Sequence, residues 1–344
     1  MQKNILVIGG TGLVGKTILR ILADRNPQHQ LYIGSRKSGS TKTQLQIDVN
    51  DPKTFVNIAG HAIDIIVLSV SDSHNNVLRY ALDHGIDYVD VTKPTPAMIE
   101  AYRLVRGHKP ESRLVFGSGW MGGIVSGLIA AAVPEKKNIQ GVGLFVYYSI
   151  KDQAGESSAH FMAENVYKPF VRYENNRPVT IRHFLDSEYH NFSFGIGKRQ
   201  AYNFDVPDLF VLNTIEGIPD VSVKMTYNSK FITRLLGIFQ YLRIFNMLSL
   251  KERRMIFGSG GSGDQTLFDI VIKVQDRTKT ISVRSAKGQA ELTALSMVLH
   301  VEKLIHGAFP NGIYFAHQLH KPQELMAQLQ GHDGITVKCE NGTM

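Results

Sequence analysis

The sequence predicts an α/β chain in which a doubly wound parallel sheet is followed by a second, α+β domain. Over residues 1–133, apolar runs alternate with helical patterns, which is typical of βαβ units. A glycine-rich turn follows the first apolar run directly. Beyond residue 133 the alternation stops. We therefore expect domains at 1–133 and 134–309, and a C-terminal segment, 310–344, that packs back on the first domain.

Short apolar runs and helical spacing define the elements of the first domain. The predicted strands are Asn4–Ile8, Gln30–Gly34, Gln44–Ile47, Asp64–Ser69, Asp87–Val91 and Arg113–Phe116. The predicted helices between them are Leu13–Arg25, Lys53–Ala59, Asn75–His84 and Pro96–Arg106. A further apolar helix, Gly123–Val133, is expected to leave this layer.

The second domain has a mixed pattern. Gly141–Ile150, Leu267–Val274 and Lys279–Arg284 have the β-branched content of strands, whereas Ala290–His306 is rich in helix formers. Phe231–Leu250 is apolar and aromatic and has the character of an amphipathic helix. Packing in the core or in a homodimer interface is the more common role of such a stripe, and contact with a membrane or a lipid-like ligand is the less expected alternative.

Composition excludes several classes of protein. The chain has 344 residues, of which 43% are hydrophobic and 20% charged, as in ordinary globular proteins. A single cysteine, Cys339, excludes an internal disulfide and any cysteine-rich metal site. The net charge of +8 comes from scattered basic residues, so no nucleic-acid partner is expected. No apolar stretch is long enough to span a bilayer and no signal peptide is evident, which favours a cytoplasmic location.

The first turn is the strongest motif. It follows the strand Asn4–Ile8, opens a helix and consists of Gly9, Gly10, Thr11, Gly12, Leu13, Val14 and Gly15. Gly10, Gly12 and Gly15 satisfy G-x-G-x-x-G, in which the glycines allow a tight turn, close approach of a pyrophosphate and close helix packing. Free N–H groups at the helix start bind the phosphates. The sequence thus predicts a Rossmann-type dinucleotide-binding domain.

The same turn has a second interpretation. Gly10 to Thr17 also spells the P-loop pattern G-x-x-x-x-G-K-T. A P-loop makes no special demand on Gly12, and the apolar strand within Asp64–Ser71 does not end cleanly in the Asp that a nucleoside triphosphatase needs. We therefore expect the dinucleotide and keep a P-loop NTPase as the less favoured alternative.

The end of the second strand indicates which dinucleotide binds. NAD enzymes place an Asp or Glu there to bind the ribose hydroxyls, but this chain has Ser35, Arg36 and Lys37. A hydroxyl and a guanidinium suit a 2′-phosphate, so NADP(H) is the predicted cofactor. The remaining predicted cofactor-binding residues follow later strands: Asp48, Ser69, Val70, Ser71, Thr92 and Trp120.

Lys93 is the leading catalytic candidate, with Asp90 beside it. Asp90 lies near the end of the fifth predicted strand and Lys93 just beyond it, where the nicotinamide is expected. Hydride delivery to C=O or C=N requires a proton, which a lysine beside the cofactor can donate. His317 and His320 are spaced H-x-x-H, but with no third ligand evident we expect surface histidines and no metal site.

Taken together, these segments resemble the saccharopine dehydrogenase (saccharopine reductase-like) family. The resemblance rests on the glycine turn, on ALDHGIDYVDVT at 81–92, on FGSGWMGGIVSGLIA at 116–130 and on the ending at 312–330. The chain departs from the family where Met121-Gly122-Gly123 replaces an Asp-Pro-Gly turn, which puts an amino-acid substrate in doubt. Thr92-Lys93-Pro94 instead resembles the Glu-Lys-Pro turn of glucose–fructose oxidoreductase-like dehydrogenases, in which the lysine is catalytic.

The resemblance implies an NADP(H)-dependent oxidoreductase acting on a small or lipid-like substrate. Hydride transfer in the family occurs most often at C=N, and at C=C in some lipid-acting relatives, so C=N, C=O and activated C=C all remain open. A non-catalytic NADP-sensing regulator of the NmrA group, which shares the GGTGxxG start, is the alternative. We expect a homodimer.

Overall fold

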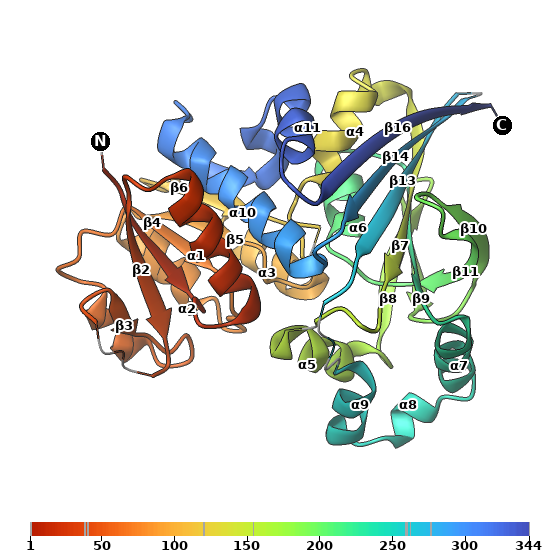
Figure 1. Cartoon of the computed structure of the whole chain (residues 1–344), viewed down its shortest axis with the longest axis horizontal. Coiled ribbons are helices and arrows are strands. Elements are labelled where there is room, and N and C mark those ends of the chain that lie inside the picture. The colour runs from red at the N-terminus through yellow and green to blue at the C-terminus, as the bar shows by residue number, and fades with distance from the viewer. Residues whose placement is uncertain are drawn as a thin grey trace. The chain divides into compact units, whose positions relative to one another are not determined.

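A computed structural model describes residues 2–37, 39, 41–119, 121–153, 155–258, 261, 263–275 and 277–343. The chain divides into two compact units (Figure 1). The first contains Met1–Ile124 and Ala290–Lys321, and the second contains Val125–Gln289 and Pro322–Met344. Residues 290–321 belong to the first unit and residues 322–344 to the second, which differs from the division expected from the sequence. The domain boundaries expected from the sequence remain a prediction.

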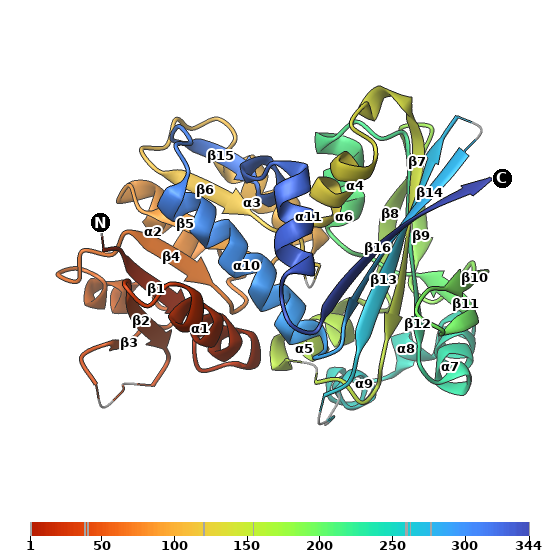
Figure 2. The ribbon, with the colours of Figure 1, turned by 45° about the horizontal axis from the view of Figure 1, so that its top comes forward.

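A seven-stranded parallel sheet forms the first unit, in the order β15-β6-β5-β4-β1-β2-β3 (Figure 2). The chain runs from β1 out to β3 and then returns to the other side of β1 for β4, which is doubly wound topology and confirms the predicted fold class. The strands are β1 Asn4–Ile8, β2 Gln30–Ser35, β3 Gln44–Gln46, β4 Ile65–Leu68, β5 Asp87–Asp90, β6 Arg113–Phe116 and β15 Gly312–Phe315.

Helices cover this sheet, and its central strands are therefore buried. Every residue of β4 is buried, as expected for a parallel strand with both faces covered. The helical elements are α1 Leu13–Arg25, η1 Pro52–Asn57, α2 Asn76–Asp83, α3 Thr95–Val105, α10 Gln289–His306 and η4 Ala316–Leu319. The helix predicted at Lys53–Ala59 is a 3₁₀ turn, which Asp51 caps through the backbone N–H of Lys53.

The second unit contains a nine-stranded mixed sheet, in agreement with the predicted α+β class. β7 and β12 are parallel, and the other pairs are antiparallel. The strands are β7 Ile139–Tyr148, β8 Pro169–Glu174, β9 Arg177–Arg182, β10 Glu188–Phe192, β11 Gly197–Asn203, β12 Asp220–Tyr227, β13 Thr266–Val274, β14 Arg277–Ser285 and β16 Ile335–Thr343.

The amphipathic segment predicted at Phe231–Leu250 is not one helix. It forms α7 Lys230–Tyr241 and α8 Ile244–Met247, and the helix breaks at Arg243, whose φ of 56° is left-handed. The other helical elements are α4 Val125–Ala132, η2 Lys136–Asn138, α5 Glu156–Asn165, α6 Asp208–Phe210, η3 Val211–Ile215, α9 Leu250–Phe257 and α11 Pro322–Gln330. Within the described residues, no helix is long and apolar enough to cross a membrane.

Candidate functional site

The predicted site residues that the structure describes gather along one edge of the parallel sheet. Strand register aligns Ile8 with Gly34 on one side and with Leu68 on the other. Leu68 in turn aligns with Asp90, and Asp90 with Phe116. The segments that follow these residues therefore leave the sheet side by side, at the edge where doubly wound sheets bind ligands.

The glycine turn has the geometry that a pyrophosphate needs. Gly9 has a φ of +85°, and a Cβ on Gly15 would lie 2.3 Å from the Gly9 carbonyl oxygen. Gly12 caps α1 without a side chain, so the N–H groups of the first helical turn, including those of Leu13 and Val14, face no side-chain cap. The helix start therefore presents backbone N–H groups of the kind that bind phosphates in Rossmann domains.

Thr17 and Lys16 have surroundings that disfavour the P-loop interpretation. The Thr17 hydroxyl donates to the Leu13 carbonyl at 2.9 Å, inside the helix. In a P-loop this hydroxyl binds the magnesium ion. Lys16 is exposed.

Ser35 ends β2, and Arg36 and Lys37 follow it next to the glycine turn. The Gly9 N–H donates to the Gly34 carbonyl at 2.9 Å, which ties the two segments together. The Ser35 hydroxyl donates to the Lys37 carbonyl at 2.8 Å, so it shapes this loop. The side chains of Arg36 and Lys37 are exposed. This arrangement suits a 2′-phosphate, whose charge two cations at one loop can neutralise.

Asp48, Ser69, Val70 and Ser71 lie at the same edge. The Asp48 carboxylate accepts the Asn50 N–H at 2.9 Å, which closes a local turn. The Ser69 hydroxyl donates to the Ile8 carbonyl at 2.9 Å and holds β4 against the glycine turn. These two side chains have structural partners, whereas Val70 is half-buried and Ser71 exposed.

Asp90, at the end of β5, organises a buried polar cluster. Its Oδ1 accepts the Thr92 N–H at 2.6 Å and the Thr92 hydroxyl at 2.7 Å. Its Oδ2 accepts the Tyr88 hydroxyl at 2.7 Å and lies 3.2 Å from Lys93 Nζ. Burial and the neighbouring Asp90 charge raise the pKa of Tyr88 well above its usual value, so Tyr88 remains a hydrogen-bond donor.

Lys93 is the unusual member of this cluster. Its side chain is only 3% exposed, and among the described residues Nζ has no hydrogen-bond acceptor in suitable geometry. Buried polar groups in native proteins are nearly always hydrogen-bonded, so an exception calls for an explanation. An ammonium group with unused donors at the ligand-binding edge is suited to bind or protonate an acceptor on a ligand.

The turn after β6 packs closely against two elements from the C-terminal part of this unit. A Cβ on Gly122, which has a φ of +62°, would lie 2.3 Å from Ser296 Cβ on α10. His300 Nε2 donates to the Gly122 carbonyl at 2.6 Å, and His300 Nδ1 accepts from His320 Nε2 at 2.7 Å. Because a carbonyl only accepts, the first bond fixes both tautomers.

The expectation of surface histidines at His317 and His320 is therefore wrong, since both are buried. Burial lowers the pKa of His300 to about 4 and that of His320 to about 2. The pairing of His300 with His320 could not be predicted from sequence, because the two residues lie on separate elements and no local motif joins them. Tyr88 was not predicted either, although the spacing Tyr88-x-Asp90 puts both side chains on one face of a strand. The predicted cofactor residue Trp120 lies outside the described residues.

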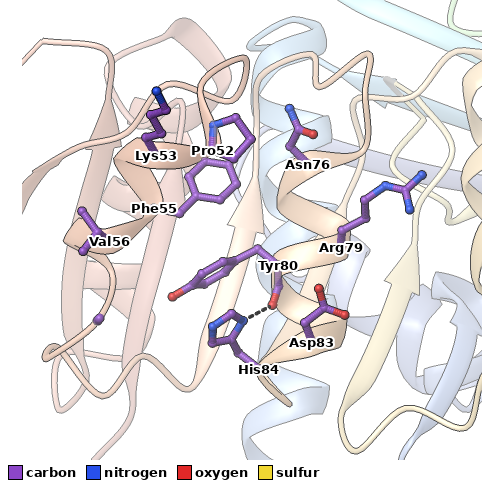
Figure 3. Close-up of a pocket in the computed structure, with 10 residues that line it drawn as sticks. Pro52, Lys53, Phe55, Val56, Asn76, Arg79, Tyr80, Asp83 and His84 are labelled. Carbon is purple, nitrogen blue, oxygen red and sulfur yellow. Dashed lines mark hydrogen bonds between the residues drawn. The ribbon is translucent and has the colours of Figure 1, made fainter.

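A separate pocket of about 420 Å³ lies between η1 and α2 (Figure 3). Phe55 and Tyr80 meet edge to face in it, and Tyr80 stacks on His84 with ring centroids 4.0 Å apart. None of the predicted site residues lines this pocket. It is therefore distinct from the ligand-binding edge of the sheet.

Comparison with known proteins identifies the first part of the chain. Residues 5–111 match the family described as the saccharopine dehydrogenase NADP-binding domain. This match confirms the resemblance and the nicotinamide cofactor expected from the sequence. No curated protein sequence matches the chain significantly.

Three solved structures with a similar chain trace are named as oxidoreductases. A Gfo/Idh/MocA family oxidoreductase from Vibrio cholerae is 13% identical, with a TM-score of 0.43 over 96% of this chain and 100% of that one. Dipicolinate-bound dihydrodipicolinate reductase from Paenisporosarcina sp. TG-14 is 10% identical, with a TM-score of 0.45 over 93% and 100%. A myo-inositol dehydrogenase from Corynebacterium glutamicum is 10% identical, with a TM-score of 0.43 over 98% and 99%. Identities and scores this low transfer no property to this chain.

Proposed function

We propose that this chain, whose residues 5–111 form a saccharopine dehydrogenase-type NADP-binding domain, is an NADP(H)-dependent oxidoreductase with Lys93 as its proton donor. The observation that carries the proposal is the Lys93 ammonium, buried beside Asp90 at the ligand-binding edge with unused hydrogen-bond donors. A non-catalytic NADP sensor needs the glycine turn but has no use for such a group.

The residues at the edge suit the cofactor. The start of α1 at Gly12 would hold the pyrophosphate, and Arg36 with Lys37 would hold the 2′-phosphate. Thr92, Val70 and Ser71 would border the nicotinamide ribose. When bound, NADPH supplies a hydride.

Lys93 and Asp90 have separate roles in this proposal. Lys93 Nζ donates a proton to the oxygen or nitrogen of the acceptor as its carbon is reduced, and afterwards regains a proton from water. The Asp90 carboxylate pairs with the Lys93 ammonium at 3.2 Å and holds it in place. Tyr88 and Thr92 fix that carboxylate through three hydrogen bonds, which leaves it little freedom to move.

The substrate class follows from the chemistry of this edge. A lysine donor suits an imine or a carbonyl, and an activated alkene if protonation follows at the adjacent carbon. Met121-Gly122-Gly123 offers no carboxylate to recognise an amino group. We therefore propose a small or lipid-like substrate that is not an amino acid. We also propose that the protein is a homodimer and is located in the cytoplasm.

The test is NADPH oxidation over a panel of cyclic imines, aldehydes, ketones and enones, with the wild-type chain and with Lys93→Met. We expect at least one class to be reduced, and Lys93→Met to lower kcat about 100-fold or more while NADPH affinity is kept. Full turnover by Lys93→Met would remove Lys93 from the mechanism. Tight NADPH binding with no reduction of any class would favour the sensor.

A further inference from the structure

The segment from α7 to α9 exposes most of the large apolar side chains on the surface of the described chain. Eight of twelve exposed large hydrophobic residues lie within residues 231–256. They are Phe231, Ile238, Tyr241, Leu242, Met247, Leu250, Met255 and Ile256. A concentration of this kind marks an interaction site, because single exposed apolar residues are normally scattered. We call residues 230–257 the apolar-basic segment.

α7 buries two polar side chains and exposes large apolar ones. Its buried residues are Thr233, Leu236, Gly237 and Gln240, and the Gln240 amide donates to the Val166 carbonyl at 3.0 Å. Its exposed face carries Phe231 and Tyr241, which are 74% and 79% exposed. A helix that only covered a core would place these residue types the other way round. The exposed face of α7 is therefore suited to contact another apolar surface.

α8 and α9 continue this surface and are firmly held. Phe245 is fully buried and anchors α8, while Met247 in the same helix is 84% exposed. A capping box between Ser249 and Glu252 fixes the start of α9. The three helices follow one another at the end of the second unit that lies lowest in Figure 1. All of the exposed apolar residues except Leu242, in the turn after α7, thus lie in these helices.

The segment is also strongly basic. It contains six cations and one carboxylate, that of Glu252, which the capping box already uses. Arg253 stacks on the Tyr167 ring at 4.3 Å, but the other five cations are exposed: Lys230, Arg234, Arg243, Lys251 and Arg254. A groove between Leu250, Lys251, Arg254 and Met255 combines both kinds of side chain. Apolar residues interleaved with cations are what an anionic lipid surface binds.

We propose that the apolar-basic segment docks the protein onto the surface of an anionic lipid bilayer, without crossing it. Aromatic and aliphatic side chains would enter the headgroup region, and the five exposed cations would pair with lipid phosphates and carboxylates. Charge complementarity decides against a second copy of this chain as the occupant, because two such segments would bring like charges together. The inference is independent of the proposed oxidoreductase activity.

The experiment is co-sedimentation of the full chain with vesicles of phosphatidylcholine alone and with added phosphatidylserine. We expect binding to the anionic vesicles and little to the neutral ones, with loss of binding in high salt. The cation variant Arg243→Gln/Lys251→Gln should reduce partitioning about tenfold or more. The apolar variant Tyr241→Ser/Met247→Ser should reduce it similarly, and because both side chains are exposed the fold should be kept.

The control variants change an exposed apolar residue and two exposed cations outside the apolar-basic segment. Val56→Ser, at a position 71% exposed, and Arg106→Gln/Lys109→Gln, at exposed positions of the first unit, should bind vesicles like the wild type. Absence of binding to anionic vesicles, or equal binding to neutral ones, would overturn the proposal. So would a wild-type dimer in sedimentation velocity that Tyr241→Ser/Met247→Ser dissociates, because the segment would then bind a second copy.

Discussion

Lys93 Nζ lies 3.2 Å from Asp90 Oδ2, and both side chains are almost completely buried. The pair is unequal: Asp90 also accepts three hydrogen bonds, whereas Lys93 has none with suitable geometry among the described residues. Asp90 therefore has a structural role even without a ligand, and the unused donors belong to Lys93.

This asymmetry predicts different effects of the two substitutions on stability. Lys93→Met leaves an Asp90 that still has three hydrogen bonds, so unfolding free energy should fall by about 1–2 kcal/mol. Asp90→Asn leaves a buried ammonium without its carboxylate, and the loss should reach about 3–5 kcal/mol. Urea unfolding followed by circular dichroism measures both. A larger loss of unfolding free energy for Lys93→Met than for Asp90→Asn would contradict this difference between the two side chains.

Gly15 should tolerate no side chain. A Cβ there would lie 2.3 Å from the Gly9 carbonyl oxygen, and neither backbone segment can move away easily. Gly15→Ala should therefore destabilise the first unit by roughly 2–3 kcal/mol and weaken NADPH binding. Gly107→Ala is the matched control, because nothing lies within 4 Å of its Cβ position. Equal melting temperatures for the two variants would contradict the close packing of α1 on the turn.

Thr17 discriminates between the two interpretations of the glycine turn. Its hydroxyl donates to the Leu13 carbonyl, so Thr17→Val should change NADPH affinity by less than about threefold, the effect of one modest hydrogen bond. In a P-loop the same substitution would remove a magnesium ligand and abolish nucleotide binding. Isothermal titration calorimetry with NADPH, and with ATP and magnesium, decides between these outcomes.

The buried histidine pair predicts a loss of stability in mild acid. Burial lowers the pKa of His300 from 6.5 to about 4 and that of His320 from 6.5 to about 2. Above pH ~6.5 both histidines are neutral in the folded and in the unfolded chain, so they add no pH dependence to the free energy of unfolding. Between that pH and the folded pKa values only the unfolded chain binds their protons, so stability falls as pH falls, by at most about 1.4 kcal/mol per pH unit and histidine.

Thermal unfolding between pH 7 and pH 5 tests this sign. His320→Gln, which still has an N–H to donate to His300, should flatten the dependence, whereas the exposed His108→Gln should leave it unchanged. A wild-type melting temperature that stays constant over this range would contradict the neutral, buried pair.

The elements that sequence predicts best are those specified locally. β1, α1 and β6 match their predicted bounds, because an apolar strand or a glycine turn followed by a 3.6-residue period needs no distant partner to be recognised. β8 to β12 were not predicted. The residues of β8, for example, are half-buried or exposed, so its sequence carries no clear alternation.

Distant contacts account for the rest. β15 joins the parallel sheet beside β6 although about 200 residues separate them. His300 meets Gly122 and His320 by the same kind of long-range packing. The order of strands explains why Asp90, Lys93 and Arg36 could be predicted to lie at one edge of the sheet, since the carboxyl ends of parallel strands share that edge. The hydrogen-bond imbalance at Lys93 depends on side-chain geometry and could not be predicted.

Calorimetric titration of the wild type and Arg36→Asp with NADPH, NADH and ATP tests most directly whether this chain binds NADP(H) through Arg36. We expect the wild type to prefer NADPH over NADH by at least about tenfold, as expected for one lost charge-assisted contact. We also expect Arg36→Asp to remove this preference and ATP to bind weakly to both proteins. Tight ATP binding with indifference to NADPH, or an unchanged preference in Arg36→Asp, would contradict binding of NADP(H) through Arg36.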